Sequence, residues 1–157
     1  MTETLMIRAA EEADAPSIAA LVQSLAHYFL ASPAMEGAEA FLSSLSQAAI
    51  ADCIKAPNFS YLVGFIDNAL VGVAALREQK HIHHLFVHPD FHRQGIAQKL
   101  WLRLKGDAIT AGNPGLFTVN ASLYAVPVYL QFGFAPTAEP QTRNGVQFQP
   151  MQLAATD

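Results

Sequence analysis

The chain of 157 residues has a length typical of one domain built around a single hydrophobic core. Hydrophobic residues make up 52% of it and charged residues 14%, a composition that excludes intrinsic disorder and predicts a large buried core. The net charge of −4 supplies no basic field for a nucleic-acid backbone or an anionic membrane, so we expect neither partner.

The N-terminal residues and the cysteine content favour a cytoplasmic protein. The start of the chain lacks the basic and apolar runs of a secretory leader, and no stretch approaches the roughly 20 apolar residues that cross a bilayer. The single cysteine, Cys53, lies in a helical pattern and is expected to be a small core residue. We therefore predict one cytoplasmic domain over residues 1–157.

The first half of the chain predicts a strand, two helices and three further strands. Asp14 stands before an early proline, as at many helix starts, and apolar residues then recur at helical spacing until Ser32-Pro33. Two strand-forming runs that meet at Asp67-Asn68 predict a hairpin. The expected elements are a strand over 4–10, helices over 16–30 and 37–56, and strands over 58–67, 69–79 and 81–89.

The second half predicts two helices and three strands. The expected elements are a helix from 96 to about 112, a strand over 115–122, a helix over 123–132 that ends at Gly133, and strands over 134–140 and 145–154. A turn at Arg143-Asn144-Gly145 should join the last two strands. The order βααβββαβαββ is typical of a mixed sheet in an α/β or α+β fold.

The stretch "HIHHLFVHPDFHRQGIAQKLW" (81–101) holds five of the six histidines and passes from strand to helix at Gly95. Unpaired N–H groups and a partial positive charge make a helix N-terminus suitable for pyrophosphate. Glycine at that position lets a phosphate approach the backbone closely. On Gly95 alone, an ordinary turn is the favoured interpretation.

Two segments resemble motifs of the GCN5-related N-acetyltransferase (GNAT) superfamily. "LFVHPDFHRQGIAQKLW" is similar to its acetyl-CoA-binding segment, Q/R-x-x-G-x-G/A, with His92 where glutamine or arginine is usual. "SLYAVPVYLQFGF" is similar to its later segment N-x-x-A-x-x-x-Y-x-x-x-G-F, with Ser122 in place of asparagine. The first strand and helix also resemble those of the family, so the resemblance covers nearly the whole chain.

The resemblance implies a sheet that splays between its fourth strand (81–88) and fifth strand (117–122), with acetyl-CoA as co-substrate in the gap. Backbone groups of Leu85 and Val87 would bind the pantetheine arm, and residues 92–97 would surround the pyrophosphate. The cofactor-binding positions carried over from the family are Leu85, Phe86, Val87, His92, Arg93, Gln94, Gly95, Ile96, Ala97, Gln98, Asn120 and Ser122.

The reaction implied is direct attack of an amine on the thioester. An alkyl ammonium titrates near about 10, so a base must first remove a proton. By resemblance, His81 stands where some family members carry a glutamate base, and neutral histidine suits this role. His83 shares a face with His81 in an undistorted strand, so these two are the expected bases, with His84 and Glu78 behind them. A bulge would change that assignment. By resemblance, Tyr129 matches the tyrosine that acts in this family as the general acid for the departing thiolate.

Other functions and the acceptor remain open at this stage. Two histidines two residues apart on a strand can share a metal, so a histidine-cluster metal-binding protein is one alternative, although we expect no metal. A non-catalytic acyl-CoA-binding module, with Tyr129 as a core aromatic, is another. The acceptor would be a small amine or a protein amine near Tyr28, Phe29 and Glu36. The apolar composition also favours a homodimer.

Overall fold

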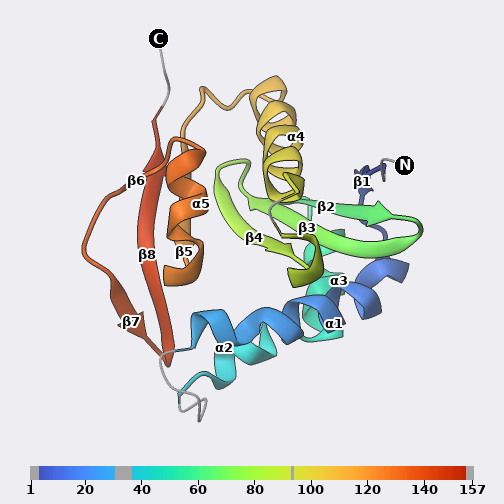
Figure 1. Cartoon of the computed structure of the whole chain (residues 1–157), viewed down its shortest axis with the longest axis horizontal. Coiled ribbons are helices and arrows are strands. Elements are labelled where there is room, and N and C mark those ends of the chain that lie inside the picture. Colours follow the sequence, from blue (N-terminus) through green and yellow to red (C-terminus); the bar gives the residue numbers. More distant parts are fainter. Residues whose placement is uncertain (1–3, 31–36, 93, 155–157) are drawn as a thin grey trace.

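The computed structural model describes residues 4–30, 37–92 and 94–154. Eight strands form a sheet in the order β1-β2-β3-β4-β5-β8-β6, and β7 pairs with β8 (Figure 1). The strands are β1 (Met6–Ala9), β2 (Phe59–Ile66), β3 (Ala69–Arg77), β4 (His81–Val87), β5 (Phe117–Ala121), β6 (Ala135–Pro136), β7 (Gln141–Arg143) and β8 (Val146–Leu153).

The helices lie on both faces of this sheet. They are α1 (Ala15–Leu25), α2 (Glu39–Ser43), α3 (Gln47–Lys55), α4 (Ile96–Thr110) and α5 (Val126–Gln131). Four short 3₁₀ turns adjoin them: η1 (Glu12–Asp14), η2 (Ala26–Phe29), η3 (Pro89–Phe91) and η4 (Leu123–Ala125). Figure 1 shows α4 on one side of the β2–β3 hairpin and α1 with α3 on the other.

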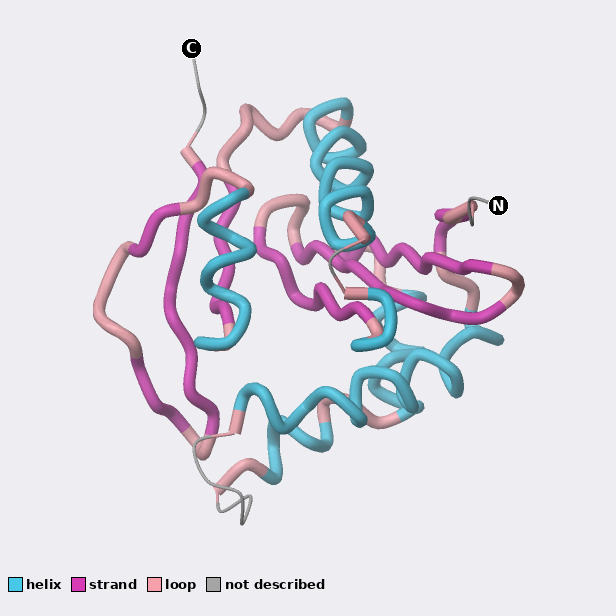
Figure 2. Tube along the Cα trace, viewed as in Figure 1, coloured by secondary structure: helices cyan, strands magenta, loops and turns pink. Residues whose placement is uncertain are grey.

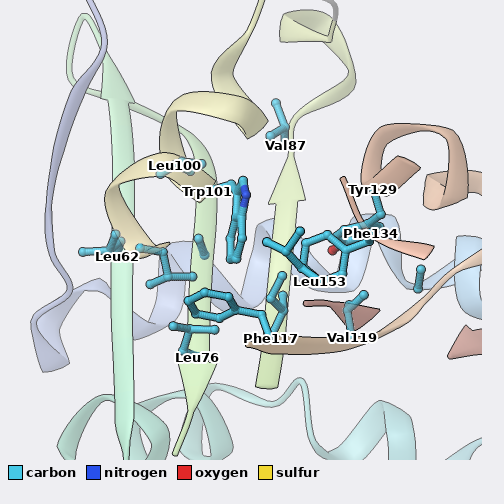
Figure 3. Close-up of a cluster of buried hydrophobic side chains, with 14 of the residues drawn as sticks. Leu62, Leu76, Val87, Leu100, Trp101, Phe117, Val119, Tyr129, Phe134 and Leu153 are labelled. Carbon is cyan, nitrogen blue, oxygen red and sulfur yellow. The ribbon is translucent and has the colours of Figure 1, made fainter. Parts of the chain in front are cut away.

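Two apolar cores result, one on each face. On the α4 face, the Trp101 ring meets Phe117 edge-on at 5.0 Å and lies 5.4 Å from Phe134. Tyr129 belongs to this same core (Figure 3). The core therefore fixes the start of α4 and the catalytic candidate of α5 relative to each other, on one side of the sheet.

The predicted splay between the fourth and fifth strands is confirmed. β4 and β5 are parallel and pair only at His81 with Thr118 and at Ile82 with Val119. Beyond Ile82 the two strands separate, as their traces show in Figure 2. A gap thus opens toward the carboxyl ends of both strands, next to the start of α4.

Two predicted elements are wrong in detail. The single helix expected over 37–56 is broken in two, because the Ser46 side chain caps α3 by accepting the Ala49 N–H at 3.1 Å. The strand expected over 134–140 is mostly irregular and pairs only at β6, since the turn at Asn144-Gly145 joins β8 to β7 instead. The break expected at Ser32-Pro33 lies outside the described residues.

Asp14 stabilises the start of α1 in a different way from the predicted N-cap. Its carboxylate accepts hydrogen bonds from both terminal nitrogens of Arg8, at 2.8 and 2.9 Å, and from the Glu11 N–H at 2.7 Å. The side chain makes no capping bond to α1. Asp14 therefore ties the end of β1 to the first helix.

Replacing Asp14 with asparagine should lower the free energy of unfolding by more at pH 7 than at pH 3. The hydrogen bond from Arg8 lowers the pKa of Asp14 below its usual value near 3.8. The stabilisation is therefore present above about pH 4 and is lost as acid protonates the carboxylate. Urea unfolding across this range tests the prediction, with Asp107→Asn, which removes an exposed pair with Arg103, as control. An Asp14→Asn effect independent of pH would contradict it.

Candidate active site

A cavity of about 630 Å³ lies where β4 and β5 separate. Its walls come from β4, β5, η2, η4, α5 and the first turn of α4. Most of the residues predicted from the sequence line it: His83, Leu85, Phe86, Val87, His92, Gly95, Ile96, Ala97, Gln98, Asn120, Ser122 and Tyr129. His81 and Gln94 are not among its lining residues, and Arg93 lies outside the described residues.

Gly95 opens one end of this cavity. It stands immediately before α4 with a φ of +77°, a conformation that costs other residues steric strain. A Cβ added there would meet no atom within 4 Å from the described residues beyond its chain neighbours, so among these residues the space in front of the helix N-terminus is open. The first turn of α4 contains no acidic residue. This end of the cavity therefore suits a phosphate group.

The backbone of β4 faces the gap at alternate residues. The His88 N–H donates to the Val71 carbonyl at 2.8 Å, so its backbone points toward β3. Because this direction alternates along a strand, the backbone of Phe86 also faces β3, and that of Leu85 and Val87 faces the gap. The cavity therefore has peptide groups at Leu85 and Val87 that an amide-containing chain could bind in strand fashion.

The unusual His92 has a structural explanation. Its Nε2–H donates to the Val87 carbonyl at 2.8 Å and so reaches back from the turn to the end of β4. The side chain fixes the turn against the strand and occupies one of the backbone acceptors that face the gap. A histidine at this position therefore shapes the cavity by a contact within the protein.

A bulge places the strand histidines differently from an undistorted strand. Ala75 pairs with His84, whereas the next residue, Leu76, pairs with Ile82, so His83 is the extra residue. The rings of His83 and His84 lie side by side with centroids 4.2 Å apart. The His81 ring lies instead beside β5, with Nδ1 2.8 Å from the Thr118 hydroxyl. The cavity thus receives His83 and His84 but not His81.

His83 and His84 are both neutral at pH 7. Burial, with smaller contributions from Arg77 and His81, lowers the pKa of His83 to about 4. Burial also lowers the pKa of His84 well below its usual value. Cys53, 3.9 Å from Nε2 of His83, has a pKa that burial raises, so its thiol is neutral as well. This part of the wall therefore offers hydrogen-bonding groups without charge.

Tyr129 reaches the cavity from the α4 face. It is only 5% exposed and packs edge-on against Phe132 at 5.9 Å and Phe134 at 5.5 Å. Burial raises its pKa far above the usual value, so the hydroxyl keeps its proton at neutral pH. Ser122, which replaces the family asparagine, accepts the Ala125 N–H at 3.2 Å and holds the turn before α5.

Residues 29–155 match the family model of the acetyltransferase (GNAT) domain. The chain belongs to this family. Its fold is also similar to that of a GCN5-related N-acetyltransferase from Rhodopseudomonas palustris (TM-score 0.76, 22% identity, 98% of both chains covered). The PaiA N-acetyltransferase from Thermoplasma acidophilum, solved with coenzyme A, gives a TM-score of 0.79 at 16% identity and covers 96% of this chain and 98% of that one. No curated protein sequence matches.

The ribosomal-protein-S18-alanine N-acetyltransferase of Escherichia coli is a third structure with a similar fold, at a TM-score of 0.67 and 19% identity over 96% of this chain and 93% of that one. The metal-site alternative finds no support within residues 4–30, 37–92 and 94–154, where no three His, Cys, Asp or Glu side chains could hold an ion. In the same part of the chain, no helix is long and apolar enough to cross a membrane.

Two tyrosines of this GNAT site could not be found from the sequence. Tyr124 stacks on Tyr28 with ring centroids 4.2 Å apart, which joins η4 to η2 beside the cavity. Tyr61 lies 2.8 Å from His84 although the whole of strand β3 separates them in the chain. Both contacts depend on how distant segments pack, so no local pattern marks them. Glu36, considered from the sequence for the acceptor, lies outside the described residues.

Proposed function

We propose that this GNAT protein transfers the acetyl group of acetyl-CoA to a primary amine by direct attack. The observation that carries the proposal is one continuous cavity with the glycine-opened start of α4 at one end, exposed peptide groups of β4 along its wall, and both Tyr129 and His83 in its lining. A cofactor with a pyrophosphate, an amide-containing arm and a reactive thioester fits this sequence of groups.

The chain offers a group for each part of the cofactor. Backbone N–H groups at the start of α4, from Gly95 to Gln98, would hold the pyrophosphate. The Leu85 peptide and the Val87 N–H would bind the amides of the arm as a neighbouring strand would, since His92 already occupies the Val87 carbonyl. The relative from Thermoplasma acidophilum was solved with coenzyme A, which supports the same ligand here.

The reaction needs one proton to leave the amine and one to reach the departing sulfur. As the new C–N bond forms and the C–S bond breaks, Tyr129 would donate its proton to the thiolate. His83 would take the amine proton, directly or through water, because it is neutral and lines the cavity. His81 is placed less well, since its ring lies against Thr118.

A free-thiol release assay with acetyl-CoA tests the proposal over a panel of alkyl amines, aromatic amines, amino acids and peptides. Acceptor-dependent release of coenzyme A is expected. The alternative is a non-catalytic acyl-CoA-binding module. Its support is that His92 and Ser122, which depart from the family motifs, make hydrogen bonds within the protein. Calorimetric binding of acetyl-CoA with no thiol release from any acceptor would favour that alternative.

His83→Ala should lower kcat/KM by about 10–100-fold, at or below the low end of the range for general bases, because a pKa near 4 lies far from neutral pH. In the wild type, activity that depends on neutral His83 should persist on acidification until about pH 4 rather than 6.5. The matched control is His81→Ala on the same strand, which we expect to retain most activity. Unchanged kcat/KM and pH profile in His83→Ala would exclude it as the base.

A further inference from the structure

Tyr61 and His84 form a buried pair that the mechanism above does not use. The two residues lie on β2 and β4, in one row across the sheet, because Tyr61 pairs with Ala75 and Ala75 pairs with His84. The small Ala75 side chain leaves room for the tyrosine to reach over β3. The Tyr61 hydroxyl lies 2.8 Å from Nδ1 of His84.

The chemistry of the pair fixes the direction of this hydrogen bond. A phenol is a good donor and a weak acceptor, whereas the unprotonated imidazole nitrogen is a good acceptor. Burial raises the pKa of Tyr61, so the proton stays on its oxygen. Donation also satisfies the only donor of Tyr61, which has no other hydrogen-bond partner among the described residues. Nδ1 of His84 therefore accepts, and Nε2 carries the hydrogen.

The Nε2–H of His84 is available to a ligand. His84 is only 5% exposed and lines the cavity. In the described part of the chain, no protein group accepts a hydrogen bond from Nε2. Every fully buried side-chain nitrogen and oxygen there has a partner, so an unpartnered Nε2 is not fully buried. Because His84 lines the cavity, we infer that Nε2 is accessible from it. His84 in this tautomer is a donor to the cavity and cannot be a base through Nε2.

The position of His84 favours the amine acceptor as its ligand. The ring packs edge-on against Phe86 at 5.5 Å and lies within the apolar core of α1 and α3, on the face of the sheet opposite α4 and Tyr129. The described lining contains no Asp, Glu, Lys or Arg. A neutral donor in such surroundings suits a carbonyl oxygen, because a carboxylate would lack a compensating charge.

We propose that the Nε2–H of His84, held in this tautomer by Tyr61, binds a carbonyl oxygen next to the reacting amine, so that the preferred acceptors are α-amino amides, the group at a peptide N-terminus. This inference rests on the proposed acetyltransferase function. An α-amine also suits the site because the pKa of its ammonium is about 8, below that of an alkyl ammonium. A weak base therefore removes its proton more easily. His84 is then a substrate-binding residue and Tyr61 a positioning residue.

Two acceptors that differ only in the carboxamide group, which carries the carbonyl, test the proposal: phenylalanine amide and 2-phenylethylamine. His84→Leu should raise KM for the amide about tenfold and change the kinetics of the amine little, as expected for one lost hydrogen bond. His84→Gln, which retains an N–H donor, should restore part of the loss. If His84→Leu lowered kcat/KM equally for both acceptors, the proposal would be overturned. It would also be overturned if the wild-type enzyme acetylated 2-phenylethylamine but not phenylalanine amide. Either result would leave the acetyltransferase function intact.

The tautomer can be read without any activity. Nitrogen-15 NMR of the histidine side chains, with His84 assigned from the signal missing in His84→Leu, should show hydrogen on Nε2 in the wild type. Tyr61→Phe should give a mixture of tautomers. A wild-type His84 with hydrogen on Nδ1 would overturn the proposal. If no acceptor releases coenzyme A from the wild type, the proposed function itself fails, a result distinct from every outcome above.

Discussion

Replacing Tyr129 with phenylalanine should lower kcat by about 10²–10⁴-fold, the usual contribution of a general acid. The ring would keep its contacts with Phe132 and Phe134, so the fold should be preserved. What is lost is the proton that the departing thiolate needs. Because burial raises the pKa of Tyr129, loss of its proton should not limit wild-type activity in the neutral or mildly alkaline range. Steady-state thiol release across pH measures both effects.

The control for this variant is Tyr124→Phe, which also removes a hydroxyl from the cavity wall. Tyr124 is 58% exposed and stacks on Tyr28, and a phenylalanine ring at this position would keep the stacking contact. We expect this variant to retain most of kcat. Calorimetry should give both variants the acetyl-CoA affinity of the wild type. A Tyr129→Phe enzyme with nearly normal kcat would show that water or another group protonates the sulfur.

Gly95→Ala should weaken acetyl-CoA binding on the order of 100-fold, as expected if two charge-assisted hydrogen bonds from the helix start are lost. The added Cβ would project into space that the described residues leave open, where the phosphate is expected to approach. The left-handed backbone at a φ of +77° should also cost about 1–2 kcal/mol of stability. Calorimetric titration and thermal unfolding separate the two effects.

Gly112→Ala is the matched control for the glycine prediction. Gly112 follows the other end of α4, has a φ of +116°, and likewise leaves open space around an added Cβ. It should therefore lose stability without losing affinity for acetyl-CoA. Equal affinities in the Gly95 and Gly112 variants would mean that the α4 N-terminus does not bind the phosphates.

The sequence predicted those parts of the fold that depend on local pattern. The apolar stripe Ile96, Leu100, Leu104 and Ala108 is buried as expected on α4. The Asp67-Asn68 turn joins β2 and β3 with both residues at positive φ. The strand–proline–glycine–helix passage also forms as expected, because each of its steps is determined by neighbouring residues.

The sequence did not predict the features that depend on register or on distant contacts. Whether His83 or His81 faces the cavity is decided by the bulge opposite Ala75, and strand alternation alone cannot place a bulge. The hydrogen bond between Tyr61 and His84 passes over a third strand and has no local signal. The break before α3 was missed because apolar periodicity continues across Ser46, whereas the capping bond interrupts the helix.

Because β4 and β5 pair over only two residues each, the rest of β4 has unpaired peptide groups in the middle of the sheet, as an edge strand has. Exposed strand edges elsewhere invite pairing with other protein chains. Here the peptide groups of Leu85 and Val87 face a gap bordered by α5 and the start of α4, where another protein strand has little access. A bound pantetheine arm would act as the missing strand and connect the two halves of the sheet. Binding of the cofactor would then also raise the free energy of unfolding, because the same hydrogen bonds to β4 hold the cofactor and complete the sheet.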